Sequence, residues 1–237
     1  MRNLIIASTS TIHGSGYLDY IKEDVLTALK EFGATSLLFI PFARPGGITH
    51  EEYTKKVQVA LEDTGIKVVG LHEVKDPKQA ILEAKAIFTG GGNTFVLLNE
   101  LYKRDVLTAL RKAIFSGTFY LGTSAGSNLC GLTVNNTNDM PIVHPPSLKA
   151  LGVIGYNINP HYLDPVSGST HMGETRETRI NEFHTYHHIP VVGLREGSYI
   201  RVLGDKELLK GELTARVFKK DNKPVEVSPD FDFATLT

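Results

Sequence analysis

The sequence has a single cysteine, Cys130, and no tryptophan among its 237 residues. One thiol cannot form an internal disulfide or supply a multi-cysteine zinc site, and this composition is typical of proteins kept in a reducing cytoplasm. Long apolar runs are lacking too, because every stretch falls short of the roughly 18 residues that a membrane-spanning helix requires. We therefore expect a cytoplasmic protein that makes no use of a membrane.

An excess of charge of either sign is also absent. The chain carries 25 basic and 26 acidic side chains, which gives a formal net charge of -1. This balance provides no whole-molecule attraction to nucleic acid or to an anionic membrane surface. A small, specific ligand is the favoured partner, and the composition leaves a monomer and a homodimer equally open.

Short β-branched runs alternate with helical patterns through the first half of the chain. The runs lie at 3–9, 36–42, 67–72, 86–92 and 119–124, and helical patterns lie between them at 17–33, 51–65, 76–84 and 94–117. The runs are apolar without strict alternation, as expected for parallel strands covered on both faces. The pattern predicts a three-layer α/β fold with a mostly parallel central sheet flanked by helices.

The pattern changes after residue 190, where turn signals such as GDK and KDNK separate short alternating strands. We expect these to be antiparallel strands that extend an edge of the central sheet. No repeat, low-complexity tract or linker divides the sequence, so a single domain over 1–237 is predicted.

The segment FYLGTSAGSNL at 119–129 passes from an apolar strand into a small-residue turn and then a helix. Gly122 and Gly126 flank Ser124 in the G-x-S-x-G pattern of a nucleophile elbow, where small neighbours allow a strained backbone and expose the central hydroxyl. The following helix would point free amides at a reacting oxygen. A serine that only caps the helix is the alternative for this pattern.

Three consecutive glycines, Gly90 to Gly92, follow the strand at 86–89 and precede a helix. Such a segment lets the backbone approach a ligand closely with its amides free to donate, as a second oxyanion donor would. The alternative is a phosphate cradle, but neither a P-loop lysine nor the G-x-G-x-x-G fingerprint is present.

A catalytic serine needs a base, and the base needs an orienting group. His161 follows Pro160, which ends the strand-like run at 152–160 and leaves the imidazole at its mouth. Glu196, at the end of another predicted strand, and Asp139 are both candidates for the orienting carboxylate, and the sequence alone does not decide between them. If the acid is Glu196, its place after the histidine differs from the serine, acid, histidine order of α/β-hydrolases.

Taken together, these motifs resemble the peptidase E family of α-aspartyl dipeptidases, serine peptidases with a flavodoxin-like fold related to class I glutamine amidotransferases. The matching stretches are spread in order over most of the chain, from about residue 3 to residue 218: FIPFA at 39–43, GGGNTF at 90–95, GTSAGSN at 122–128, TNDMPIV at 137–143, INPHY at 158–162, GETRETRI at 173–180 and GLREGSYI at 193–200.

The resemblance implies roles for residues in these stretches. Ser124 would be the nucleophile, His161 the general base and then acid, and Glu196 the orienting carboxylate, with Asp139 as the rival acid or a substrate contact. The amides of Gly91 or Gly92 and of Ala125 would form the oxyanion hole. A small peptide with an N-terminal aspartate would be the substrate, and no metal or organic cofactor would be needed.

An arginine would hold the aspartate side chain of such a substrate, because a guanidinium can bind a carboxylate bidentately. Arg176 and Arg179 lie in the GETRETRI stretch, and we favour Arg176 as the substrate ligand, with Asn93 as a further contact. The alternative for either arginine is a surface salt bridge with Glu174 or Glu177.

Two other functions stay open from the sequence. A cyanophycinase-like exopeptidase would use the same scaffold and serine on a polymer with an aspartate backbone. A non-catalytic protein that binds a small anion would use the glycine loops without a nucleophile.

Overall fold

The computed structural model describes residues 1–165, 168 and 172–236. Its strands and helices, in chain order, are β1 (Asn3–Ala7), α1 (Lys22–Glu31), β2 (Ser36–Ile40), α2 (His50–Ala60), β3 (Lys67–Gly70), α3 (Pro77–Glu83), β4 (Ala86–Thr89), α4 (Thr94–Lys103), α5 (Leu107–Phe115), β5 (Phe119–Thr123), α6 (Ala125–Asn128), β6 (Asn157–Pro160), α7 (Arg176–Tyr186), β7 (Val191–Leu194), β8 (Tyr199–Leu203), β9 (Lys206–Lys210), β10 (Ala215–Phe218) and β11 (Val225–Val227).

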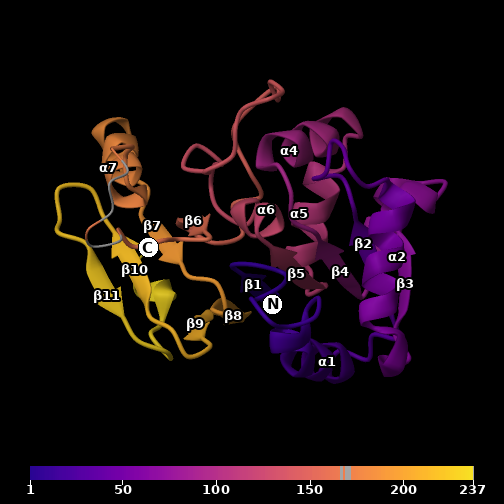
Figure 1. Ribbon diagram of the computed structural model, residues 1–237. Helices are drawn as coiled ribbons and strands as arrows, with labels where there is room; N and C mark the ends of the chain where they lie inside the picture. The colour runs from indigo at the N-terminus through magenta and orange to yellow at the C-terminus, as the bar shows by residue number, and fades with distance from the viewer. Residues whose placement is uncertain (166–167, 169–171, 237) are drawn as a thin grey trace.

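The larger of the two sheets contains the strands of the predicted βα alternation (Figure 1). Within the described residues its seven strands run in the order β3-β2-β4-β5-β1-β8-β9. The strands from β3 to β1 are parallel neighbours, and β8 and β9 continue the sheet beyond β1 as antiparallel strands. The predicted mostly parallel central sheet is confirmed, and so is its antiparallel extension at one edge.

Helices cover both faces of this sheet, as the side chains of β1 illustrate. Leu4 and Ile6 belong to a buried cluster with side chains of α3, α4 and α5, whereas Ile5 and Ala7 belong to a second cluster with α1 and α2. Alternate residues of a strand point to opposite faces, so both faces of β1 are apolar. This explains why the strand reads as a continuous hydrophobic run.

A second sheet departs from the expectation that all strands after residue 190 would extend the central one. It has the order β11-β10-β7-β6, with β6 and β7 parallel and the other neighbours antiparallel. The expectation is wrong for β7, β10 and β11. Strand patterning reports which face of a strand is buried but not which strand it pairs with, and the α7 crossover carries the chain back beside β6.

The helical pattern at 94–117 forms two helices, α4 and α5, instead of one. The break lies at Asp105, which adopts φ of 52°, a left-handed conformation that aspartate tolerates better than most side chains. The amides of Asp105 and Val106 donate back to Tyr102 and Leu101, closing the end of α4.

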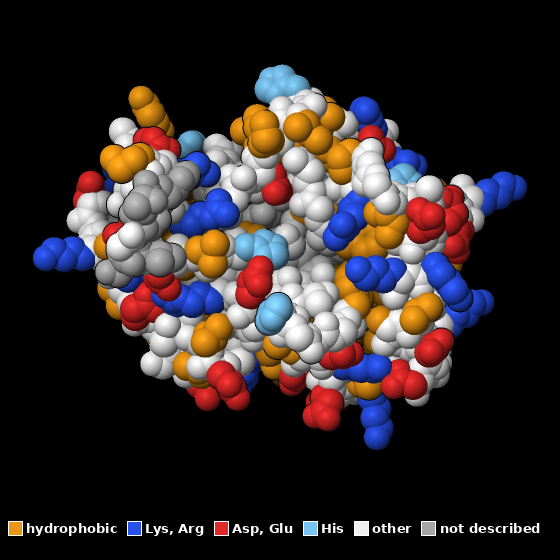
Figure 2. All heavy atoms as spheres, in the orientation of Figure 1, with side chains coloured by type: hydrophobic (Ala, Val, Ile, Leu, Met, Phe, Trp, Pro, Cys, Tyr) orange, Lys and Arg blue, Asp and Glu red, His pale blue; other side chains and the backbone are white. Residues whose placement is uncertain are grey.

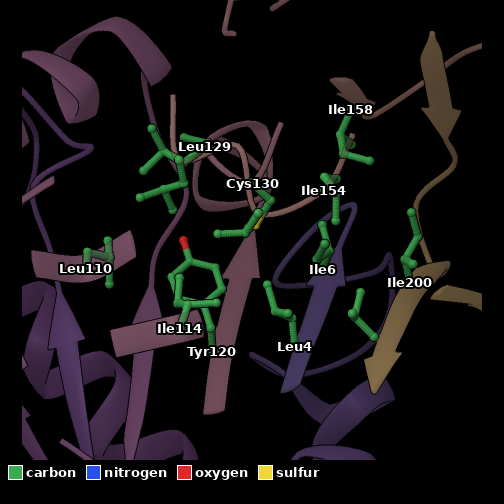
Figure 3. Close-up of a cluster of buried hydrophobic side chains, with 14 of the residues drawn as sticks. Leu4, Ile6, Leu110, Ile114, Tyr120, Leu129, Cys130, Ile154, Ile158 and Ile200 are labelled. Atoms are coloured by element: carbon green, nitrogen blue, oxygen red, sulfur yellow. The ribbon is translucent and has the colours of Figure 1, made fainter. Parts of the chain in front are cut away.

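Part of the larger core lies directly beneath the turn after β5. In Figure 3, Tyr120 of β5 and Leu4 of β1 lie near Cys130 in the segment after α6, and Leu110 of α5 belongs to the same buried cluster. Burial raises the pKa of the Cys130 thiol. Because Cys130 lies in this core, the short helix between Ser124 and Cys130 is held against it. In the part of the chain that the structure describes, no helix has both the length and the apolar character to cross a membrane.

Candidate active site

The predicted nucleophile, its base, the acid Glu196 and the glycine loop come from the carboxyl ends of strands in both sheets. Ser124 follows β5, and the glycines at 90–92 follow its neighbour β4 in the central sheet. His161 follows β6, and Glu196 lies two residues beyond its parallel neighbour β7 in the second sheet. Carboxyl ends of parallel strands are where ligand sites form in open α/β folds. In the space-filling view, histidine, acidic and basic side chains gather around a hollow near the middle of this face (Figure 2).

The backbone of Ser124 has the strain expected of a nucleophile elbow. Its φ is 52° and its ψ is −109°, outside the regions that side-chain-bearing residues favour. Its amide donates to the Ala7 carbonyl, and its own carbonyl accepts from the amides of Ser127 and Asn128. These bonds to β1 and to α6 hold the residue in the strained conformation.

The two glycines of the elbow are required by close backbone contacts. A Cβ on Gly126 would lie 2.2 Å from the Thr89 carbonyl oxygen, and one on Gly122 would lie 2.7 Å from the Gly126 carbonyl oxygen. The absence of side chains at 122 and 126 therefore lets β4, β5 and α6 approach closely enough to present Ser124.

Alanine at position 126 is expected to lower the free energy of unfolding by about 3 kcal/mol, because backbone atoms must move to admit the methyl group. Urea denaturation of Gly126→Ala checks this value. Gly46→Ala is the matched control, since a Cβ there meets nothing within 4 Å and the residue has no positive φ. A loss of stability of the same size in both variants would contradict the steric explanation.

The side chains of Ser124, His161 and Glu196 form a continuous hydrogen-bonded chain. His161 Nε2 lies 2.8 Å from Ser124 Oγ, and His161 Nδ1 lies 2.6 Å from Glu196 Oε1. A carboxylate opposite Nδ1 favours the tautomer with a proton on Nδ1, which leaves Nε2 free to accept the serine proton. The imidazole is 37% exposed and the carboxylate 48%, so solvent reaches both groups.

Asp139, the other predicted acid, lies elsewhere. Its Oδ2 accepts a hydrogen bond from the Thr94 amide at 2.7 Å and another from Thr137 Oγ1 at 3.2 Å. A carboxylate at the first turn of α4 is favourable because unpaired amides and the positive end of the helix dipole meet there. Of the two candidates, it is Glu196 that contacts the imidazole.

Asn93 has both ends of its amide occupied. Its oxygen caps α4 by accepting from the Val96 amide, and its nitrogen donates to the Met140 carbonyl at 2.9 Å. The side chain therefore joins the start of α4 to the 134–150 loop, and a substrate contact through it would have to share these groups.

The glycine loop lies beside the elbow. A Cβ on Gly91 would be only 3.0 Å from Ser124 Cβ, and Gly92, at φ of 146°, packs so closely that its Cβ would be 2.3 Å from the Ala43 carbonyl oxygen. Among the described residues, the amides of Gly91, Gly92 and Ala125 donate to no acceptor. Backbone donors beside a nucleophile are suited to a developing oxyanion.

One residue that contacts the glycine loop was not predicted from the sequence motifs. The buried hydroxyl of Tyr53, in α2, donates to the Gly91 carbonyl at 3.1 Å. In a trans peptide the carbonyl and the next amide point in opposite directions, so this bond also fixes the direction of the Gly92 amide. The segment EEYTKK gives no local signal for such a role.

Arg176 and Arg179 both lie in the first turn of α7 but have different surroundings. Arg179 Nε lies 3.7 Å from Glu174 Oε2, and Glu177 pairs instead with Arg216 at 2.8 Å. Within the described residues, half-buried Arg176 forms no ion pair or hydrogen bond. Partial burial, with repulsion from Arg179, lowers the pKa of Arg176, and the negative charge of Asp139 acts in the opposite direction. The salt-bridge alternative thus applies to Arg179, whereas the guanidinium of Arg176 is unpaired in the part of the chain that the structure describes.

The match to known proteins extends over nearly the whole chain. The model for peptidase family S51 matches residues 4–209. The chain belongs to peptidase family S51. As a member of that family it is a serine-type peptidase.

Several similar proteins align over nearly their full length. A protein named probable alpha-aspartyl dipeptidase from Drosophila melanogaster is 45% identical, covering 99% of this chain and 97% of the fly protein. Peptidase E from Streptomyces coelicolor is 47% identical, covering 99% and 94%. A crystal structure of a peptidase from an acI-B1 actinobacterium has a TM-score of 0.73 at 16% identity, covering 98% and 96%, and this likeness supports the fold.

Proposed function

We propose that this serine dipeptidase hydrolyses dipeptides with an N-terminal aspartate through an acyl-enzyme on Ser124. The observation that carries the proposal is the hydrogen-bonded chain from Glu196 through His161 to Ser124 on a strained elbow. The substrate class is supported by the names of relatives that align over nearly their whole length, and by the guanidinium of Arg176, for which the described residues provide no partner.

In the first half of the reaction, Ser124 Oγ attacks the carbonyl carbon of the aspartyl residue while His161 Nε2 takes the hydroxyl proton. The Glu196 carboxylate stabilises the imidazolium that forms, and His161 then donates the proton to the leaving amine. Water attacks the resulting ester with His161 as the base again, which releases free aspartate and restores the serine.

Backbone amides stabilise the oxyanion of both tetrahedral intermediates in this proposal. The amide of Gly91 or Gly92 supplies one hydrogen bond, and the amide of Ala125 at the start of α6 supplies the other. Removing a single donor of this kind from an enzyme typically costs about 10²- to 10³-fold in kcat. The contact from Tyr53 to the Gly91 carbonyl supports the loop in the required orientation.

Arg176 binds the side-chain carboxylate of the substrate. A half-buried guanidinium that is unpaired within residues 1–165, 168 and 172–236 favours a ligand that brings its own negative charge, and it penalises a neutral substrate that leaves it unpaired. Asp139 is close enough to affect Arg176 electrostatically, so the two charges can receive the carboxylate and the ammonium group of one N-terminal aspartate.

Glutamine at position 176 is expected to lower kcat/KM for Asp-Leu roughly 100-fold and to remove the preference for Asp-Leu over Asn-Leu, because the charged contact is lost. Initial rates of amino-acid release from Asp-Leu, Asn-Leu and Glu-Leu measure both quantities. Arg179→Gln is the matched control, since that side chain lies on the same helix and is paired with Glu174. Loss of the preference in Arg179→Gln alone would assign the carboxylate to the other arginine.

The substrate panel also separates the alternatives. A cyanophycinase-like exopeptidase would leave Asp-Leu intact and cleave a polymer with an aspartate backbone. An anion-binding protein would cleave neither, and a serine-directed inhibitor would not label it at Ser124. Because the proposed mechanism needs no metal, the rate on Asp-Leu is expected to be unchanged by EDTA.

Three further proposals concern the whole chain. We propose that 1–237 folds as one domain, because Ser124 comes from one sheet and His161 and Glu196 come from the other, so the site cannot be divided between independent units. A cytoplasmic location rests on the single buried cysteine. The third concerns the oligomeric state, a monomer or a homodimer, which size-exclusion chromatography would distinguish.

A further inference from the structure

Ser8, directly after β1, makes two hydrogen bonds that reach the second sheet. Its side chain is fully buried. Its Oγ donates to the Leu194 carbonyl at 2.7 Å and accepts from the backbone amide of His161 at 2.9 Å. One hydroxyl therefore contacts the last residue of β7 and the residue that follows β6.

Both contacts lie next to proposed catalytic residues. Leu194 stands two positions before Glu196, and its carbonyl also accepts from the Tyr162 amide at 3.1 Å. His161 itself has φ of 53°, a sparsely populated conformation for a residue with a side chain, so contacts from its surroundings help to hold it. The bond from its amide to Ser8 is part of what holds it.

The residue before Ser8 holds the other half of the site. The Ala7 carbonyl accepts from the Ser124 amide at 3.2 Å and from Ser127 Oγ at 2.6 Å. Ala7 and Ser8 thus connect the elbow on one side to His161 on the other, at the end of β1, which lies between β5 and β8 in the central sheet (Figure 1).

We propose that Ser8 is a positioning residue for the reaction: its hydroxyl fixes the end of β6 against the end of β7 and holds His161 Nε2 at hydrogen-bonding distance from Ser124 Oγ. Strand pairing orders residues within each sheet, but Ser124 and His161 belong to different sheets. Ser8 supplies a direct link between the two sheets beside the reacting atoms. Because the hydroxyl is fully buried and hydrogen-bonded to two backbone groups, this role requires no contact with the substrate.

Removing the hydroxyl should release the His161 backbone from its left-handed conformation. The His161 amide would lose its acceptor inside the protein, and the chain would relax towards a more favourable φ. Because the imidazole would move with its backbone, the distance to Ser124 Oγ would lengthen. Displacing a catalytic group by about 1 Å can lower the rate about 100-fold.

The test is steady-state kinetics on Asp-Leu with Ser8→Ala and Ser8→Cys, beside wild type. We expect kcat to fall roughly 30- to 100-fold with KM within about threefold of wild type, because alignment for the chemical step is lost and the substrate contacts are kept. Ser8→Cys fills the space but replaces the hydroxyl with a weakly hydrogen-bonding thiol, so it should behave as Ser8→Ala does. The reaction of Ser124 with a serine-directed inhibitor should slow in both variants.

Thr118→Val is the control for the general effect of losing a hydrogen bond from a side-chain hydroxyl. The Thr118 hydroxyl donates to the Ala84 carbonyl at 3.0 Å, and the residue precedes β5, at the end of the strand opposite Ser124. This variant should keep wild-type kcat and KM. Its melting temperature should fall by an amount comparable to that of Ser8→Ala.

Two results would overturn the inference. One is a kcat of Ser8→Ala within about threefold of wild type, and the other is full activity in Ser8→Cys, which would show that volume and not the hydroxyl matters. The inference rests on the proposed roles of Ser124 and His161. Wild type that cleaves neither Asp-Leu nor a polymer with an aspartate backbone, and whose Ser124 is not labelled by a serine-directed inhibitor, would remove those roles as well. Active wild type with an unaffected Ser8→Ala would remove only the role of Ser8.

Discussion

Ser124→Ala is expected to lower kcat for Asp-Leu hydrolysis by about 10⁴-fold or more, because the covalent route to aspartate is lost with the hydroxyl. The remaining rate over water would come from the amides of the glycine loop and of Ala125, which still bind the substrate carbonyl. Release of free aspartate over hours, followed by chromatography with EDTA present, measures so large a loss.

The folded state of this variant provides its control. Serine and alanine have similar size, and the backbone bonds of residue 124 to Ala7, Ser127 and Asn128 do not involve the hydroxyl. The far-ultraviolet circular dichroism spectrum and the melting temperature should therefore match those of wild type, and Asp-Leu should still bind. If a well-folded Ser124→Ala kept more than about a hundredth of the wild-type kcat, the acyl-enzyme would be excluded as the main route.

The features predicted well from the sequence are those with local causes. Gly122, Ser124 and Gly126 lie within five residues and form a recognisable local pattern, and the contact that demands glycine at 122 is with Gly126 in the same turn. Similarly, Pro160 ends β6 at the residue before His161, so a local signal places the imidazole at the mouth of a strand. The alternation of strands and helices predicted the layers of the central sheet for the same reason.

The features that the sequence did not decide depend on pairing between distant segments. Whether Glu196 or Asp139 contacts His161 depends on β7 lying beside β6, and the sequence pattern instead suggested that strands after residue 190 extend the central sheet. The partner of each arginine in α7 was undecided because Glu177 turns towards Arg216 on β10. These outcomes are set by tertiary contacts and not by spacing along the chain.

Contacts made by a single hydroxyl group are the hardest to predict from the sequence. Ser8 bonds to an amide 153 positions away, and Tyr53 bonds to a carbonyl 38 positions away. Neither residue belongs to a pattern of spacing or charge, because one side-chain oxygen can support a site from any element that happens to pass beside it. Only the folded arrangement of β1 and α2 around the site shows that these two residues contact it.

Glutamine at position 196 is expected to lower kcat about 10³-fold while leaving KM nearly unchanged. The amide keeps the shape of the side chain, but its NH₂ group can face His161 Nδ1 and favour the tautomer with a proton on Nε2, which cannot accept the proton of Ser124. The loss should be smaller than in Ser124→Ala, since Glu196 is 48% exposed and water can partly replace the carboxylate. Steady-state kinetics on Asp-Leu measure the change.

Asp139→Asn is the matched removal of a carboxylate charge from the rival acid. Its oxygen can still accept from the Thr94 amide, so the variant should keep kcat within about tenfold and lose about 0.5 to 1 kcal/mol of stability as the charge leaves the first turn of α4. KM should rise, because the charge proposed to receive the substrate ammonium group is lost and the electrostatic support that Asp139 gives to Arg176 is lost with it. A loss of kcat near 10³-fold in Asp139→Asn, with the kcat of Glu196→Gln almost unchanged, would contradict the role of Glu196. It would mean that the imidazole turns to Asp139 during the reaction and that the 2.6 Å hydrogen bond to Glu196 does not contribute to catalysis.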